Sequence, residues 1–226
     1  MMRELRRSID VLFVEGRDDE AVVNAFVRRR LGIELGPPLK LVKRPDSDGA
    51  ASGVSSAPGD AGALRRFKNY LLDGQRGARV GLVVDRDTTD NDKWPRVADC
   101  LRERGGKCDE PSSAGAIFDI HDRDIRAGIW MWPDNVSHGA LEHFVRAIIP
   151  ESDVLAYAED ATRVAKSEHG AEYEDTDERK AALKVRSIWR DASTAGGYGH
   201  LVRNLDLIDS EASTAFLAWF NKLFLA

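Results

Sequence analysis

The sequence is poor in cysteine and contains no long apolar run. Its two cysteines, Cys100 and Cys108, form neither a metal-ligand pattern nor a disulfide framework, so reduced thiols are expected. The apolar stretch after the basic start is interrupted by Asp10, and it is too short for a signal peptide. No other stretch approaches the length that spans a bilayer. We therefore predict a cytoplasmic protein without a membrane partner.

An excess of positive charge is also absent. The chain has 33 Lys and Arg residues against 38 Asp and Glu residues, which gives a formal net charge of −5. A protein of this charge has no bulk attraction for a polyanion, so a nucleic-acid partner would require local basic patches or bound metal. With 226 residues, 42% of them hydrophobic, the chain is long enough to bury a sizeable core.

Short apolar segments alternate with segments of helical spacing along the first part of the chain. This alternation predicts an α/β fold of the Toprim or Rossmann type, with a central, mostly parallel sheet flanked by helices. After Gly139 the pattern becomes helical. We expect an α/β catalytic core over residues 1–150 and a helical extension over 151–226 that packs on it. The expected strands lie at residues 9–14, 39–44, 78–84, 115–120 and 126–132, a loop is expected over 45–62, and a glycine-rich turn over 195–200.

Acidic residues stand where two of these strands end. Glu15 directly follows the first strand, and Asp85 and Asp87 follow the strand that ends at Val84. Parallel strands share one carboxyl edge, where ligands bind, so these acids would meet if the strands are neighbours. Asp19 lies one helical turn after Glu15 and can return to the same place. Carboxylates crowded in this way favour a hard cation, Mg²⁺ or Mn²⁺.

A single acid after a strand is more often a helix cap or a turn residue, and Asp18 fits that description. The repetition of the pattern at two strand ends favours a site over two independent caps.

The two segments that carry these acids, VLFVEGRDD and VGLVVDRD, resemble the Toprim domain of topoisomerases, bacterial primases, recombination proteins and OLD-family nucleases. The resemblance covers roughly residues 9–145. Two details resemble the OLD-type branch: the acid Asp19 four residues after Glu15, and the segment WPDNVSHGALEHF, which would make Glu142 a further ligand or water-orienting acid. That branch also has a downstream lysine, for which Lys180 and Lys184 are equal candidates.

The sequence departs from the other branches. It has no room for the tyrosine-bearing cleavage domain of a topoisomerase, and it lacks the zinc-binding and helicase-binding modules of a replicative primase. It also lacks the Walker A sequence of the ATPase domain that OLD nucleases usually carry. A separate ATPase subunit is therefore an expected partner. By analogy, a stand-alone Toprim chain with a helical tail is similar to small nuclease partners of prokaryotic defence systems.

The resemblance implies metal-dependent hydrolysis of phosphodiester bonds in DNA or RNA, by an endonuclease or an exonuclease. Glu15, Asp19 and Asp85 would hold one Mg²⁺ or Mn²⁺ ion, and Asp87 and Glu142 a second one. A lysine near the scissile phosphate would offset charge that develops in the transition state. Basic residues would hold the substrate backbone, with Lys43, Arg44, Arg65, Arg66 and Arg186 as candidates.

Two alternatives remain open at this point. One is a Toprim phosphotransferase, such as a primase-like enzyme, that joins or synthesises rather than cuts. The other is a non-catalytic Toprim module that binds metal and a protein partner. The clustered acids favour an enzyme, since a scaffold has no use for them. The oligomeric state, including a homo-oligomer, is not specified by the sequence.

Overall fold

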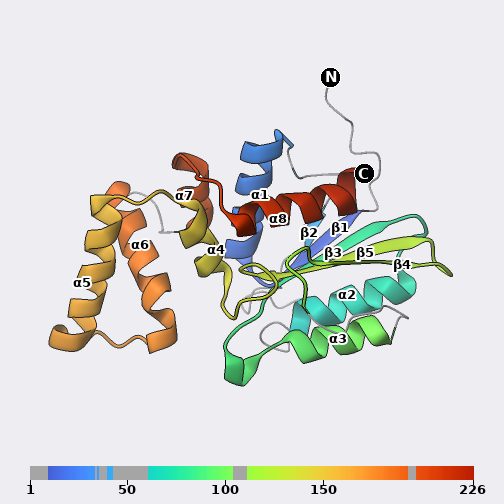
Figure 1. The fold of residues 1–226 in the computed structure, drawn as a ribbon, viewed down its shortest axis with the longest axis horizontal. Coiled ribbons are helices and arrows are strands. Elements are labelled where there is room, and N and C mark those ends of the chain that lie inside the picture. The colour runs from blue at the N-terminus through green and yellow to red at the C-terminus, as the bar shows by residue number, and fades with distance from the viewer. Residues whose placement is uncertain (1–9, 34, 36–39, 43–60, 104–110, 193–196) are drawn as a thin grey trace, which may run out of the picture.

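The computed structural model describes residues 10–33, 35, 40–42, 61–103, 111–192 and 197–226 (Figure 1). Its centre is a five-stranded sheet with the strand order β2-β1-β3-β5-β4. Neighbouring strands run parallel except at the β4 edge, where β4 and β5 are antiparallel. The expected α/β fold with a mostly parallel sheet is therefore confirmed. The strands are β1 (Val11–Val14), β2 (Lys40–Val42), β3 (Arg79–Asp85), β4 (Ala116–Ile120) and β5 (Ile125–Trp132).

Three helix ends carry residues that favour those positions. Ser152 caps α5 by accepting a hydrogen bond from the Leu155 N–H, and Ser210 caps α8 from the Ser213 N–H. Gly32 ends α1 in the left-handed conformation. The α-helices are α1 (Arg17–Leu31), α2 (Ala61–Asp73), α3 (Trp94–Arg102), α4 (Leu141–Ile148), α5 (Asp153–His169), α6 (Glu178–Arg190), α7 (Tyr198–Asn204) and α8 (Glu211–Phe220). Two short 3₁₀-helices, η1 (Thr89–Asn91) and η2 (Asp175–Asp177), and a π-helical turn after α8, η3 (Asn221–Leu225), complete the elements.

Both faces of the sheet are covered, as expected for parallel strands. Helices α2 and α3 lie on one face and α1 and α8 on the other (Figure 1). Side chains alternate along β1, so that Phe13 packs with Phe67 of α2 while Leu12 belongs to the core on the opposite face. The two faces therefore hold separate apolar cores.

Helix α8 covers the core on the face of the sheet where α1 also lies. Phe216 stacks on Trp132 with ring centroids 5.2 Å apart, and Trp219 Nε1 donates a hydrogen bond to the Ala116 carbonyl. The sheet makes room for this end of the chain at Gly128, where a Cβ atom would lie 2.7 Å from a methyl carbon of Leu223. The last residues of the sequence are thus part of the core.

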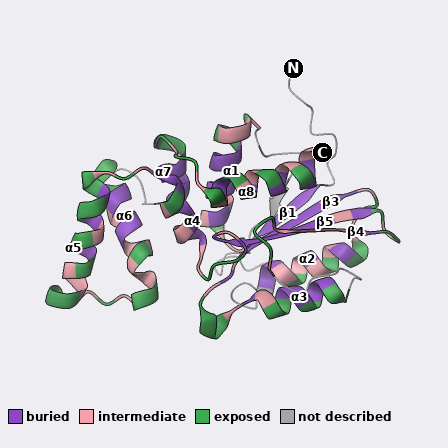
Figure 2. Cartoon of the chain, viewed as in Figure 1, coloured by how far each residue is buried: buried purple, intermediate pink, exposed green. Residues whose placement is uncertain are grey.

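Helices α5 and α6 pack on one another at one side of the molecule, and α4 and α7 lie between this pair and the sheet (Figure 1). The facing sides of α5 and α6 are buried and their outer sides are exposed (Figure 2). Helix α7 was not predicted: the expected turn over 195–200 is wrong from Tyr198 onward, because Gly197 caps a helix there. Most of the loop expected over 45–62 lies outside the described residues, and the division near residue 150 stays a prediction.

Within the described ranges, no helix is long and apolar enough to cross a bilayer.

Candidate active site at the ends of β1 and β3

Strands β1 and β3 are neighbours, so the acids at their ends come together. Val14 is in register with Val83, and the next residues bring Glu15 beside Asp85. The Glu15 carboxylate accepts a hydrogen bond from the Asp85 N–H at 3.0 Å. The sheet topology therefore places at one edge two acids that lie 70 residues apart in the sequence.

Asp19 lies beside Glu15, in the first turn of α1, and is 7% exposed. One of its oxygens accepts a hydrogen bond from Trp132 Nε1 at 2.9 Å, and the other from the Gly16 N–H at 3.1 Å. Burial, followed by the negative charge of Glu15, raises the pKa of Asp19 to about 7. Asp19 is therefore fixed in place, and it keeps its proton to a higher pH than an ordinary aspartate does.

Asp85 links the sheet to α4, because its Oδ1 accepts a hydrogen bond from the Leu141 N–H at 2.9 Å. Burial raises its pKa well above the ordinary value for an aspartate. Three further carboxylates raise that pKa through their charge, those of Glu15, Asp19 and Glu142. Four of the predicted acids thus act on one another electrostatically.

Asp87 stands in the loop that follows β3, with a positive φ of 66°. Aspartate tolerates this left-handed conformation better than most residues. Two backbone hydrogen bonds, of 2.8 and 2.7 Å, tie Asp87 to Gly139 in the loop before α4. Arg86 adds a second tie, since its guanidinium pairs with Asp92 and donates to the Val136 carbonyl. The loops that carry the acids are therefore held against one another.

Lys93 belongs to this site and was not named in the sequence analysis. Its ammonium lies 2.9 Å from Glu15 Oε1 and 3.1 Å from Asp87 Oδ2, and the residue is 7% exposed. Burial opposes its charged form, but the charges of the two acids outweigh burial and raise the pKa of Lys93. Lys93 is therefore a permanent cation between two of the predicted metal ligands.

In this arrangement, no three His, Cys, Asp or Glu side chains of the described residues are close enough to hold one metal ion. Lys93 instead joins Glu15 to Asp87. The site as described is an acid cluster that a lysine partly neutralises.

Glu142 and Tyr198 complete the surroundings. Glu142 stands in the first turn of α4, and Tyr198 begins α7. Tyr198 is 2% exposed, and its hydroxyl has no hydrogen-bond partner among the residues that the structure describes. Burial, then the charges of Glu142 and Asp18, raise the pKa of Tyr198, with smaller effects of Asp177 and Asp85. An unpartnered buried hydroxyl therefore lies among carboxylates from the starts of α1, α4 and α6.

Comparison with known protein families places both the sheet and its C-terminal helices in one family. A family model described as "Protein of unknown function (DUF3226)" matches residues 9–225. The chain belongs to the DUF3226 family. No curated protein and no solved structure matches the sequence.

The two lysines expected downstream lie on α6 of this DUF3226 protein. Lys180 Nζ is 3.5 Å from Asp177 at the start of α6, and its side chain is about half exposed. Lys184 is exposed and lies one turn further along the helix. Asp177 lies near enough to Tyr198, which borders the acid cluster, for its charge to raise the pKa of that tyrosine. Lys180, which pairs with Asp177, is therefore at the end of α6 that is nearer the acid cluster.

The predicted substrate-holding residues are scattered. Lys43 and Arg44 lie outside the described residues. Arg65 and Arg66 are on α2, exposed and partly exposed respectively. Arg186 is only 4% exposed, so it does not lie on the surface as expected of a residue that holds a nucleic-acid backbone.

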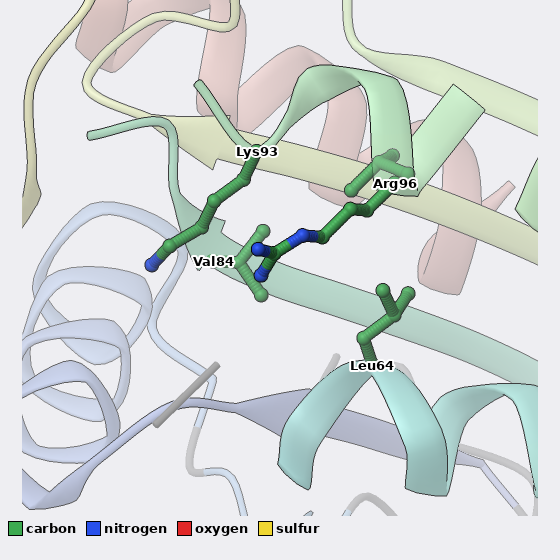
Figure 3. Close-up of a pocket in the computed structure, with 5 residues that line it drawn as sticks. Leu64, Val84, Lys93 and Arg96 are labelled. Atoms are coloured by element: carbon green, nitrogen blue, oxygen red, sulfur yellow. The ribbon is translucent and has the colours of Figure 1, made fainter. Parts of the chain in front are cut away.

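A small hollow adjoins the acid cluster, lined by Leu64, Val84, Lys93, Arg96 and Val97. Figure 3 shows the Lys93 and Arg96 side chains extending in the same direction past Val84, at the end of β3.

The sequence does hold a signal for Lys93, since it is one of only two basic residues between Asp85 and Trp94. Its contact with Glu15 depends on the fold of that loop.

Proposed function

We propose that this protein is a Toprim-type nuclease, which hydrolyses phosphodiester bonds with Mg²⁺ or Mn²⁺. The observation that carries the proposal is the hydrogen-bonded pair of Glu15 and Asp85 at the ends of adjacent parallel strands. Asp87 follows in the loop after β3, and Asp19 in the helix after β1. This order and placement of acids resembles the Toprim pattern.

The acid cluster suits a hard divalent cation in the chemistry of its donors. All the donors are carboxylate oxygens, and their mutual repulsion raises the pKa of Asp85 even with Lys93 nearby. We assign Glu15, Asp85, Asp87 and Glu142 as ligands of one or two ions, around which these side chains would have to draw closer together than they lie in the described structure. Asp19 supports them, because both of its oxygens already accept hydrogen bonds. Bound metal would supply an activated water and polarise the phosphate.

Lys93 takes the role first expected of Lys180 or Lys184. Its buried ammonium among the acids is placed to offset negative charge on a phosphate. Lys180 remains a second candidate, at the start of α6. Arg96, beside the hollow, and the α2 residues Arg65 and Arg66 are the proposed contacts to the substrate backbone.

The substrate is DNA or RNA, and the protein acts in the cytoplasm. The net charge of −5 gives the protein little electrostatic affinity for nucleic acid, so we propose that a separate ATPase subunit increases this affinity. A role in prokaryotic defence follows by analogy with stand-alone Toprim chains.

One observation favours a second candidate, a non-catalytic module that binds a protein partner. The ion pairs of Lys93 with Glu15 and Asp87 give these acids a cationic partner without any metal. A module of this kind would keep the lysine bridge permanently and would not cleave nucleic acid.

The decisive experiment is a cleavage assay. Supercoiled plasmid, linear DNA and tRNA are incubated with the protein in Mg²⁺, Mn²⁺ or EDTA, alone and in lysate from cells that co-express the neighbouring genes. Cleavage should require the divalent cation, and Glu15→Gln and Asp85→Asn should abolish it. Asp122→Asn, in the exposed turn between β4 and β5, is the matched control and should cleave normally. Equal cleavage by wild type and both site variants would favour the binding module.

A further inference from the structure

A second charged feature lies on α6, away from the acids. Arg186 is 4% exposed, and its Nε and Nη1 atoms make no hydrogen bond to any of the described residues. Within the described part of the chain it forms no ion pair. A buried guanidinium is normally paired, because removing a charge from water without a partner strongly destabilises the folded state. Arg186 therefore lacks a counterion that its position requires.

The nearest charges make this requirement stronger. Burial, followed by the positive charges of Arg190 and Arg146, lowers the pKa of Arg186, and no acid offsets them. Arg146 is itself paired, since its guanidinium lies 2.7 Å from both Glu159 and Glu151. Three guanidinium groups therefore lie near one another, and one of them has no partner among the described residues.

The residue next to Arg186, Ser187, also buries a polar group that lacks a described partner. Ser187 is fully buried, and its hydroxyl also has no hydrogen-bond partner. Two consecutive residues of α6 thus bury polar groups that nothing in the described structure satisfies. Such groups in native proteins usually have a bound partner.

This region is distinct from the acid cluster. Asp177 precedes α6 at the end near Tyr198, and Arg186 follows nine residues later in the sequence. At about 1.5 Å per residue the two lie about 13 Å apart along the helix. Helices α4 and α7 both pack against α6.

We propose that Arg186 is the centre of an anion-binding site that takes a phosphate group, either free or on a small molecule. The planar guanidinium fork matches a phosphate oxyanion in two parallel hydrogen bonds. One turn further along α6, the indole of Trp189 stacks on Tyr157 with centroids 5.5 Å apart, and both rings are exposed. This aromatic surface suits the ring of a nucleotide whose phosphate binds at Arg186.

The test measures melting temperature and binding heat in EDTA, with inorganic phosphate or AMP against NaCl at equal ionic strength. Wild type should gain several degrees at saturating phosphate, because a ligand that binds only the folded state stabilises it. Arg186→Met should lose this gain. Arg163→Met, which removes an exposed arginine of α5, is the matched control and should keep it.

The outcomes are distinct. No gain and no binding heat in wild type with either ligand, or an equal gain in Arg186→Met, overturns the site. If Arg186→Met does not fold, Arg186→Lys replaces it and should bind phosphate at least tenfold more weakly, and unchanged binding overturns the proposal. If AMP binds more tightly than phosphate and Trp189→Ala removes only that difference, the ligand is a nucleotide. Equal affinities indicate free phosphate. Because EDTA removes divalent cations, the result does not depend on the proposed nuclease activity.

Discussion

The ammonium of Lys93 lies 2.9 Å from the carboxylate of Glu15, in a position where the sequence predicts a metal ion. A second contact, 3.1 Å to Asp87, makes this lysine a bridge between the ends of β1 and β3. A bound divalent cation and this ammonium would neutralise the same carboxylates. Lys93 therefore sets how strongly the acids attract a metal.

Lys93→Met should lower the stability of the metal-free protein and raise its affinity for Mn²⁺. Removal of one partner from a buried ion pair destabilises by about 3 kcal/mol, while the acids left behind attract a cation more strongly. Chemical denaturation and titration calorimetry measure the two effects. Lys222→Met, at an exposed position of η3, is the control. Unchanged stability and unchanged affinity would show that the bridge has no role in the site.

Asp85→Asn and Glu15→Gln should change metal-free stability in opposite directions. The pKa of Asp85 is raised by burial and neighbouring acids, so a neutral Asn relieves repulsion and keeps an oxygen for the Leu141 N–H. Glu15→Gln instead leaves Lys93 without its closest partner. We expect a higher melting temperature for the first variant and a lower one for the second at pH 8. Both should lose the stabilisation that millimolar Mg²⁺ or Mn²⁺ gives to wild type, and a retained response would exclude this site as the metal site.

The metal-free protein should lose stability as the pH rises from about 4 to 8. The folded-state pKa of Asp19 is about 7 against an ordinary 3.8. Between these two pH values the folded state still holds a proton that the unfolded state has already released, so folding becomes less favourable as the pH rises. This difference corresponds to about 4 kcal/mol, or a fall in melting temperature on the order of 10 °C. Asp19→Asn should flatten the dependence between pH 5 and pH 8. A wild-type melting temperature that rises over this range would contradict the assignment.

Tyr198→Phe should leave the fold intact and slow cleavage. The hydroxyl is buried and has no partner in the described part of the chain, so its removal should stabilise the metal-free protein by up to about 1 kcal/mol. If the hydroxyl donates to a phosphate or water in the working site, cleavage should fall several-fold. Denaturation and the plasmid assay separate the two effects. A destabilised Tyr198→Phe would mean that the hydroxyl already has a partner in the free protein.

The positions of Glu15 and Asp85 at strand ends could be predicted from the sequence because they depend on local patterns. Apolar strands that end on Glu15 and Asp85 are visible in a one-dimensional pattern, and parallel strands share an edge. That β1 and β3 are direct neighbours is a property of the sheet order, which only the folded chain shows. Lys93 was missed for the same reason, because its contact with Glu15 joins residues 78 positions apart.

Arg186 shows a different limit. It was read as a surface cation from its charge, yet it lies on the buried face of α6 with Ala182, Leu183 and Ser187. The spacing of these residues is that of one helix face, so the pattern itself held the information. Helix α7 was missed because glycines at residues 196, 197 and 199 indicate a turn, while packing against α1 favours a helix.

The position of α8 in the core also bears on how the protein is made. On a ribosome, strands β1 to β5 emerge well before residues 211–225, which cover Leu12, Trp130 and Trp132 in the finished protein. Until that segment emerges, one side of the sheet has an exposed aromatic surface. The nascent chain should therefore fold late and bind a chaperone that recognises apolar segments, and a nascent chain stalled near residue 150 should remain bound to it.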